Sequence, residues 1–329
     1  AKNGRIPHAQ LFVGKEGSGT LPVAIAYAQF LLSHFSDNPT ASELKVAKLQ
    51  HPDLHFAFPV TTNDSVKKHP VSNLFLNEWR DFVSKQPYGG LFNWLQSIGV
   101  ENKQGMIGVD EALEVVKKLQ LKSYEGGFKV MIIWMAEKMN IAASNKLLKL
   151  IEEPPAKTIF LLITENEDQI INTIKSRCQA LHFPVLSEKD IAMSLVAREN
   201  SSESEALKIA TQAEGNYNKA VHLLHQDSND LIFEEWFITW IRAAFKAKGN
   251  AAIIQELVVW AETIAKSGRE TQKQFLAYCL QFFRQALLLN YKSPELVFLE
   301  IKTPKFNLQN FAPFVHSENI LAIEKELND

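Results

Sequence analysis

The stretch from residue 129 to residue 178 constrains the fold of this chain more than any other. It opens with an unbroken apolar run, Val130 to Met135, which is typical of a strand buried on both faces of a parallel sheet. A second run of this kind spans Thr158 to Ile163. The pattern between them predicts a helix from Ile141 to Glu153, which two consecutive prolines end because proline cannot continue a helix. Strand, helix and strand in this order predict a right-handed crossover and therefore an α/β fold.

Two helices are each expected to bury one apolar face. Asp110 is expected to cap a helix over Glu111 to Leu121, because its side chain can accept a hydrogen bond from a free backbone N–H group. The side chains expected to point inward are Leu113, Val116 and either Leu119 or Leu121 in this helix, and Ala142, Leu147, Leu148 and Ile151 in the helix from Ile141 to Glu153.

Composition restricts the classes of function that remain open. The chain has 329 residues and 46% hydrophobic content, enough to bury two or three cores. Its 35 Lys and Arg against 37 Asp and Glu give a net charge of -2, so contact with DNA would need a local basic patch. Cys178 and Cys279 lie about a hundred residues apart, which is no metal-site spacing, and we expect reduced thiols. No apolar run reaches about 18 residues and the N-terminus lacks a signal-peptide core, so we expect a soluble cytoplasmic protein.

A glycine-rich turn follows a short predicted strand, Leu11 to Val13, and precedes a helix that begins near Pro22. The spacing of residues 14–19 matches the first six positions of the phosphate-binding loop G-x-x-x-x-G-K-[ST]. Thr20 stands where a lysine would reach the β- and γ-phosphates, and Leu21 where a hydroxyl would hold magnesium. Weak anion or nucleotide binding and a purely structural turn both remain open, and the two missing groups favour the second. The candidate nucleotide-binding residues are Gly14, Gly17 and Gly19.

Residues 33–105 show a weaker pattern, with a strand expected near Leu54 to Phe58 and a short helix over Leu74 to Ser84. His51 and His55 are four residues apart, but an intervening proline weakens any helix that would place them on one face. Because no cysteine lies nearby, we interpret them as ordinary surface histidines and not as metal ligands.

Four segments, in this order and at this spacing, carry a resemblance to a known family: FVGKEGSG, LLKLIEEPP, LLITEN and SRC. They resemble the clamp-loader branch of the AAA+ proteins, as found in bacterial DNA polymerase III. The resemblance is specific from Gln10 to Phe183 and loose afterwards. It implies an AAA+ parallel-sheet core at residues 1–184, a three-helix lid at 185–227 and a helical collar for oligomerisation at 228–329. The helices expected beyond the core are Ser187–Arg198, Glu203–Ala213, Asn216–His225, Ala251–Lys266, Arg269–Leu289 and Glu318–Leu327. A polar break is expected at Gln226–Asp230. The residues after it form an apolar stripe, made of Leu231, Ile232, Phe233, Trp236, Phe237, Trp240, Ile241 and Ala244.

The resemblance also implies roles for individual residues. Thr164 falls at the family's polar sensor, and Arg177 of the SRC triplet falls at the arginine finger, which reaches into the ATP site of a neighbouring subunit. A guanidinium at the γ-phosphate offsets charge that develops during transfer and is worth about a thousandfold or more in rate. The alternative for Arg177 is a surface ion pair. Cys178 is expected to be a small packing residue and not a reactive thiol.

This sequence departs from the family at the catalytic positions. Trp134 and Met135 replace the Asp-Glu pair that would hold the metal and prepare water, and Asn218 replaces the second sensor arginine of the lid. Together with the missing lysine and hydroxyl, five groups are absent, so we expect no ATPase or polymerase activity from this chain. Residues 33–51 contain no cysteine, so we expect no zinc site there. We also expect no other cofactor, with ATP hydrolysed by partner subunits.

The function implied by the resemblance is that of a non-hydrolysing clamp-loader subunit, which supplies Arg177 in trans and helps load the sliding clamp onto primed DNA. The implied partners are the motor subunit (tau/gamma), the delta subunit, the sliding clamp indirectly, and primer-template DNA through the assembled ring, with no membrane. An active AAA+ motor subunit of the same loader is one alternative, against which the five missing groups argue. A stand-alone DNA-binding protein is another, but the sequence shows no basic stripe.

Overall fold

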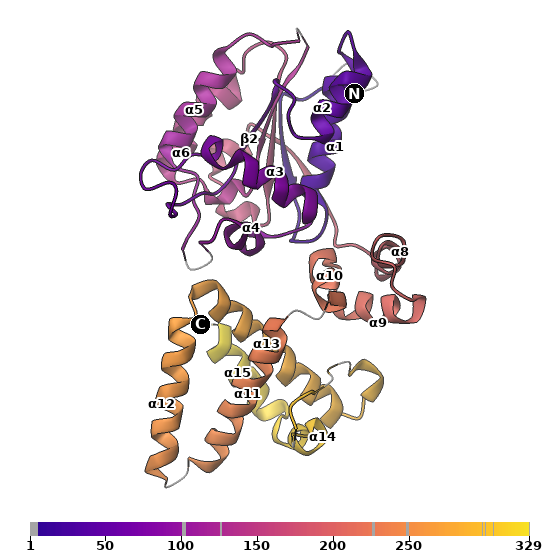
Figure 1. The fold of residues 1–329 in the computed structure, drawn as a ribbon, viewed down its shortest axis with the longest axis vertical. Coiled ribbons are helices and arrows are strands. Elements are labelled where there is room, and N and C mark those ends of the chain that lie inside the picture. The colour runs from indigo at the N-terminus through magenta and orange to yellow at the C-terminus, as the bar shows by residue number, and fades with distance from the viewer. Residues whose placement is uncertain are drawn as a thin grey trace. The chain divides into compact units, whose positions relative to one another are not determined.

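The computed structural model of this chain describes residues 6–328, apart from 101–102, 126, 226–227, 248–249, 298, 300 and 305. The chain divides into two compact units, Ala1–Val221 and His222–Asp329, which Figure 1 draws as a ribbon. The division falls inside a helix, whereas the sequence placed the boundary between residues 227 and 228. The three-part division into core, lid and collar stays a prediction.

A parallel sheet forms the centre of the first unit. Among the described residues it has five strands in the order β2-β3-β4-β1-β5, and every neighbouring pair runs parallel. The predicted α/β class is therefore confirmed. The strands are β1 (Ala9–Val13), β2 (Leu54–Ala57), β3 (Lys129–Ile133), β4 (Thr158–Thr164) and β5 (Gln179–His182).

Helices cover both faces of this sheet, as expected when crossovers join parallel strands. Buried side chains of α1 to α4 pack on one face, and those of α5 to α7 pack on the other (Figure 1). The helices of the first unit are α1 (Thr20–His34), α2 (Pro39–Ala47), α3 (Leu76–Lys85), α4 (Leu91–Ser97), α5 (Val109–Gln120), α6 (Ile141–Glu152), α7 (Asn172–Lys175), α8 (Glu188–Glu199) and α9 (Glu203–Ala213), with 3-10 turns at Ser72–Phe75, Ala136–Lys138 and Glu167–Gln169. The division between the two units falls within α10 (Tyr217–His225).

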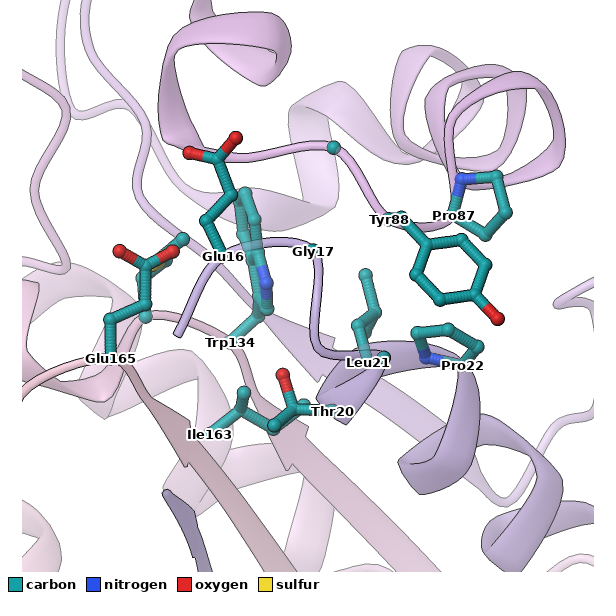
Figure 2. Close-up of a pocket in the computed structure, with 13 residues that line it drawn as sticks. Glu16, Gly17, Thr20, Leu21, Pro22, Pro87, Tyr88, Trp134, Ile163 and Glu165 are labelled. Carbon is teal, nitrogen blue, oxygen red and sulfur yellow. The ribbon is translucent and has the colours of Figure 1, made fainter. Parts of the chain in front are cut away.

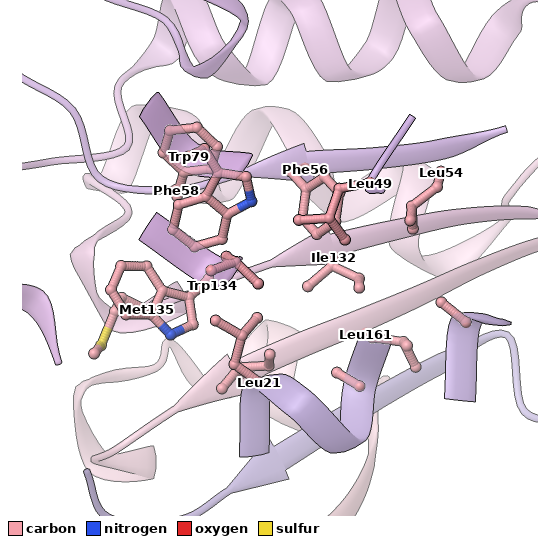
Figure 3. Packing of buried hydrophobic residues seen from close by; sticks show 14 of the residues in the cluster. Leu21, Leu49, Leu54, Phe56, Phe58, Trp79, Ile132, Trp134, Met135 and Leu161 are labelled. Atoms are coloured by element: carbon pink, nitrogen blue, oxygen red, sulfur yellow. The ribbon is translucent and has the colours of Figure 1, made fainter. Parts of the chain in front are cut away.

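An aromatic cluster fills the core between the sheet and α3 and α4. Figure 3 shows part of it, including Phe58, Trp79 and Trp134. Trp79 lies at its centre and is fully buried, with ring centroids 4.2 Å from Phe58, 5.2 Å from Trp94 and 5.1 Å from Trp134. Aromatic pairs at such separations add to the stabilisation that comes from area burial alone. This packing joins Trp134, at the end of β3, to the helices that cover the sheet. We call Phe56, Phe58, Trp79, Phe82, Trp94 and Trp134 the aromatic cluster.

The predicted inward face of α5 is right at Leu119 and wrong at Leu113. Ala112, Val115 and Leu119 are buried, Val116 is half-buried, and the side chains of Leu113 and Leu121 are exposed. The cap is also different, because Gly108 precedes the helix and no side chain caps it. Asp110 instead places Oδ2 2.8 Å from Nδ1 of His69. Glu111 turns inward and accepts a hydrogen bond from the backbone N–H of Ser72, which fixes the rotation of the helix.

The predicted face of α6 is partly right. Leu147 and Ile151 are buried as expected and Leu148 is half-buried, but Ala143 is buried in place of Ala142. Asn140 sets this phase because its side chain accepts a hydrogen bond from the N–H of Ala143 at 2.8 Å.

His51 is buried, so its interpretation as a surface histidine is wrong. Its Nε2 lies 3.2 Å from Oε2 of Glu125 and 3.3 Å from Oγ of Ser42. The hydroxyl of Ser42 donates to the same carboxylate at 2.8 Å, and Lys45 forms an ion pair with Glu125. His55 is half-buried, and burial lowers its pKa to about 4. We call Ser42, Lys45, His51 and Glu125 the Glu125 cluster, which joins α2 to the loop before β3.

The Glu125 cluster predicts a pH dependence of stability. The Lys45 ammonium, followed by the Ser42 hydroxyl and the nearby His51, lowers the pKa of Glu125 from 4.5 to about 2 although partial burial opposes this. A carboxyl whose pKa is lower in the folded state stabilises the fold above pH 4.5 and loses that contribution as the pH falls toward 2. Measured by urea unfolding, Glu125→Gln is expected to remove about 1–2 kcal/mol of stability at pH 6 and to make little difference at pH 2.

The matched control for this experiment is Glu43→Gln, which removes an exposed carboxylate from the same helix, α2. Its unfolding free energy is expected to follow the parent protein across the whole pH range. A Glu125→Gln variant that also follows the parent would contradict the role given to the cluster.

The second unit is helical in its described residues, with α11 (Ser228–Lys246), α12 (Ala251–Lys266), α13 (Arg269–Asn290), α14 (Leu308–Phe311) and α15 (Ser317–Asn328), and with 3-10 turns at Pro294–Leu296 and Ala312–Phe314. Its core includes Phe237 and Phe282, whose ring centroids lie 4.0 Å apart.

Only part of the apolar stripe that the sequence predicted for α11 faces the core of the second unit. Phe233, Phe237 and Ile241 are buried and both tryptophans of the stripe are partly buried, but Leu231, Ile232 and Ala244 are exposed because they lie on the other side of α11. In the predicted polar break, Gln226 and Asp227 lie outside the described residues, and residues 228–230 begin the helix. No helix in the described part of the chain combines the length and apolar character needed to cross a bilayer.

Candidate nucleotide site and arginine finger

The glycine-rich loop has the strand-to-helix position that a phosphate-binding loop requires. It leaves the carboxyl end of β1, and the N–H of Gly14 donates to the carbonyl of Thr164 at 3.0 Å. Gly17 and Gly19 have φ values of 74° and 88°, a left-handed conformation that favours glycine. Gly19 directly precedes α1. The structure therefore brings the three predicted glycines together in one turn at a helix N-terminus.

The protein's own side chains fill the space beside this loop. The cavity there has a volume of about 20 Å³, room for a water molecule but not for a nucleotide. Thr20 and Leu21 are both buried against it, and Tyr88 and Trp134 close it from two sides (Figure 2). Met135 follows Trp134 in a left-handed turn, with φ of 56°, and is buried as well. Trp134 and Met135, which stand where the resemblance implies an Asp-Glu pair, are thus packing groups in this structure.

Carboxylates lie where a nucleotide site needs positive charge. Glu16 and Glu165 line the cavity and appear on the same side of it in Figure 2. Burial, reinforced by the charges of Glu16 and Glu137, raises the pKa of Glu165 from 4.5 to about 7. Lys15, the only cation within the loop, is exposed and does not line the cavity. The carboxylate of Glu16 next to the loop would repel a polyphosphate.

Residues of the predicted lid bond directly to the loop. The side-chain Nδ2 of Asn218 donates to Oε1 of Glu16 at 2.8 Å and to Oδ1 of Asn93 at 2.9 Å. The backbone N–H of Tyr217 donates to the carbonyl of Gly17 at 3.3 Å. At the position expected for a sensor arginine, the chain therefore has an amide that bonds to a loop carboxylate.

Thr164, the predicted sensor, ends β4 beside the loop and is fully buried. Its hydroxyl donates to the carbonyl of Asn166 at 3.1 Å and accepts from the Asn166 N–H at 3.2 Å. The hydroxyl thus bonds within its own turn, and its sensor role stays a prediction.

Arg177 lies on a tight turn between α7 and β5. Its N–H donates to the carbonyl of Ile174 at 3.0 Å, and its side chain is 33% exposed. Nε lies 3.0 Å from Oε2 of Glu152, an electrostatic contact outside hydrogen-bond geometry, and Nη1 donates to the carbonyl of Thr173 at 2.9 Å. The surface ion pair considered from the sequence is therefore present, and the guanidinium is still partly open to solvent.

The strand register separates Arg177 from the loop of its own chain. Gln10 lies opposite Gln179 and Val13 opposite His182 in the parallel pair of β1 and β5. Residues before β5 therefore lie at the amino edge of the sheet, whereas the loop leaves the carboxyl edge. The two edges are at least about 10 Å apart along the strands. Arg177 is thus positioned to act outside its own glycine loop.

Cys178 is half-buried against the core formed with α5 to α7. Burial raises its pKa to about 11, which favours the protonated thiol at neutral pH, and the expectation of an unreactive cysteine stays a prediction. Within the described residues, no three His, Cys, Asp or Glu side chains gather as a metal site would require. The expectation of no zinc and no other cofactor stays a prediction.

A family model described as DNA polymerase III, delta subunit, matches residues 1–187, which is more than half of the chain. The chain belongs to this family. Its curated relatives include DNA polymerase III subunit delta' of Escherichia coli (strain K12), 33% identical over 133 residues, and of Bacillus subtilis (strain 168), 29% identical over 227 residues. The tau subunit of Bacillus subtilis (strain 168) is 36% identical over 128 residues.

These alignments cover only part of each protein. The alignment with the Escherichia coli subunit covers 40% of this chain and 40% of that subunit. The alignment with the Bacillus subtilis delta' subunit covers 68% of this chain and 55% of that subunit. The alignment with tau covers 36% of this chain and 22% of tau. The relatives named delta' confirm the resemblance to the clamp loader that the sequence motifs indicated. The AAA+ type of fold, a parallel-sheet domain followed by helical parts, agrees with it.

The sequence analysis did not name several residues that make contacts in the candidate site. Glu16 and Glu165 lie inside the motif segments, at the loop and directly after β4, so their positions gave a signal. Asn93 gave none, because α4 was not predicted and its partner Asn218 is 125 residues away in the sequence. Glu152 lies in the LLKLIEEPP segment, but nothing there indicates a contact with Arg177.

Proposed function

We propose that this chain is the non-hydrolysing subunit of a DNA polymerase III clamp loader and supplies Arg177 to the ATP site of a neighbouring subunit. One observation carries the proposal: the chain's own nucleotide loop is filled by its side chains, while Arg177 lies partly exposed at the opposite edge of the sheet. A guanidinium in that position cannot assist hydrolysis at its own loop. It can stabilise the charge that develops on a γ-phosphate bound elsewhere.

The proposed partners follow from the family. The motor subunit (tau/gamma) would provide the ATP site, the delta subunit would complete the ring, and the sliding clamp and primer-template DNA would be contacted through the assembled complex. A role in replication would place the chain in the cytoplasm. The matches to both delta' and tau subunits support membership of such an assembly. The proposed zinc-free, cofactor-free state is consistent with the absence of cysteine from residues 33–51.

Magnesium-dependent ATP turnover by the isolated chain tests the first half of this proposal. The expected result is no turnover and no saturable nucleotide binding, because the loop lacks its cation and the cavity lacks room. A motor subunit prepared in the same way is the positive control. Turnover that requires magnesium, and that is lost when Gly17 is replaced by a bulkier residue, would instead favour the alternative of an active motor subunit.

A further inference from the structure

The ion pair between Glu152 and Arg177 joins two elements that are distant in sequence. Glu152 is the last residue of α6, and its neighbour Ile151 is fully buried. Arg177 follows α7, and Ile174 fixes that turn in the same core. A carboxylate at the C-terminal end of a helix is opposed by the helix dipole. The position of Glu152 is therefore unfavourable for its own helix, and the nearby Arg177 compensates for it.

The contacts of the guanidinium restrict one edge and leave the other open. Nε lies 3.0 Å from Glu152, and Nη1 donates to the carbonyl of Thr173 at 2.9 Å and lies 3.4 Å from the hydroxyl of Ser176. Nη2 has no hydrogen-bond partner within the described residues. Since arginine carries five N–H donors, two remain for an anion that approaches from solvent. The pair therefore selects one orientation of a side chain that would otherwise sample many rotamers.

We propose that Glu152 is a positioning residue that holds Arg177 with Nη2 directed toward the phosphate of a neighbouring subunit. This inference rests on the proposed function and adds to it the residue that prepares the finger before the subunits meet. Glu152 itself is 54% exposed, so the pair is weak enough for a phosphate to compete for the guanidinium. Orientation achieved before binding reduces the entropy cost of reaching the transition state.

The test compares Glu152→Gln with Glu153→Gln in the loader assembled with its motor subunit. Both variants remove one exposed carboxylate from the same helix end, but of these two described residues only Glu152 contacts Arg177. We expect Glu152→Gln to lower kcat for ATP by about threefold to tenfold with KM unchanged, because an oriented finger acts mainly on the transition state. Glu153→Gln is expected to match the parent protein, and Glu152→Asp, which retains the charge, to recover part of the lost rate.

A double substitution separates positioning from structural damage. In the Arg177→Ala background, Glu152→Gln is expected to cause no further loss, since its effect passes through the guanidinium. An equal loss in both backgrounds, a change confined to KM, or an unchanged rate would overturn the inference. Those results leave the proposed function standing as long as Arg177→Ala alone lowers turnover. If Arg177→Ala leaves ATP turnover unchanged, both the role proposed for Glu152 and the proposed function of the chain are wrong.

The isolated chain offers a second measurement that does not depend on activity. With nitrogen-labelled arginine, the Nε–H proton of Arg177 should exchange with water several times more slowly in the parent protein than in Glu152→Gln, because the charge of Glu152 holds the side chain with Nε buried. Glu153→Gln should leave that exchange rate unchanged. Equal exchange rates in the parent protein and Glu152→Gln would show that Glu152 does not restrain the side chain and would overturn the inference.

Discussion

Arg177→Ala is expected to lower ATP turnover at the neighbouring site of an assembled loader by about a thousandfold. The guanidinium lies at the amino edge of the sheet, away from the loop of its own chain, and has donors left for a phosphate. Its removal takes away charge stabilisation that lysine cannot fully reproduce, because lysine lacks the planar fork of donors. Arg177→Lys is therefore expected to restore only a small part of the rate. The measurement is single-turnover hydrolysis at the site that this subunit faces.

The fold should tolerate this change. Arg177 is partly exposed, and its ion pair with Glu152 is worth less than about 1 kcal/mol. Lys175→Ala is the matched control, since Lys175 lies on the same turn and its Nζ is 3.9 Å from Asp168. Its turnover and unfolding midpoint should both match the parent protein. Full turnover by Arg177→Ala in a correctly assembled complex would contradict the role of this residue as a finger.

Trp134→Asp is expected to destabilise the first unit by about 3–5 kcal/mol or more. This substitution restores the acidic residue that an active family member would carry after this strand. In this chain the position is buried in the aromatic cluster, with ring centroids 5.1 Å from Trp79 and 5.9 Å from Phe82. The variant would lose those contacts and bury a carboxyl group without a partner. Urea unfolding of the full chain measures the loss.

Trp134→Phe provides the control, because it keeps an aromatic ring in the cluster and introduces no polar group. It is expected to cost about 1–2 kcal/mol, less than the aspartate substitution. If Trp134→Asp were as stable as the parent protein and bound magnesium with ATP, the site could not be described as converted to packing. Its stability therefore tests the claim that hydrophobic packing has replaced catalysis here.

Four of the five described strands and most of the helices could be predicted from the local sequence pattern. The runs of β3 and β4 are long and apolar, and the helix between them ends at two prolines. The edge strand β5 was not predicted, because all four of its residues are exposed and give no apolar run. The inward faces of α5 and α6 were shifted because a hydrogen bond from Ser72 to Glu111 and the cap at Asn140 set the rotation of these helices. Periodicity predicts that a face exists but not which cap fixes its direction.

The candidate site could be predicted only where a local motif encodes it. The glycine loop and the SRC turn lie where the motifs indicated. The contacts that define their state connect residues that are far apart in the sequence, such as Glu16 with Asn218 and His51 with Glu125. Such pairs form through tertiary packing, so a local pattern can mark one position, as at Glu16, but does not identify its partner. The buried position of His51 was missed for this reason.

A structure of the assembled loader with a non-hydrolysable ATP analogue would show directly which phosphate Arg177 reaches. We expect Nη2 of Arg177 to lie about 3 Å from a γ-phosphate oxygen bound by a neighbouring subunit. We also expect the loop of residues 14–19 to hold no nucleotide. Nucleotide bound in that loop, or Arg177 with no phosphate within reach, would show that this chain does not act as a non-hydrolysing subunit with a finger in trans.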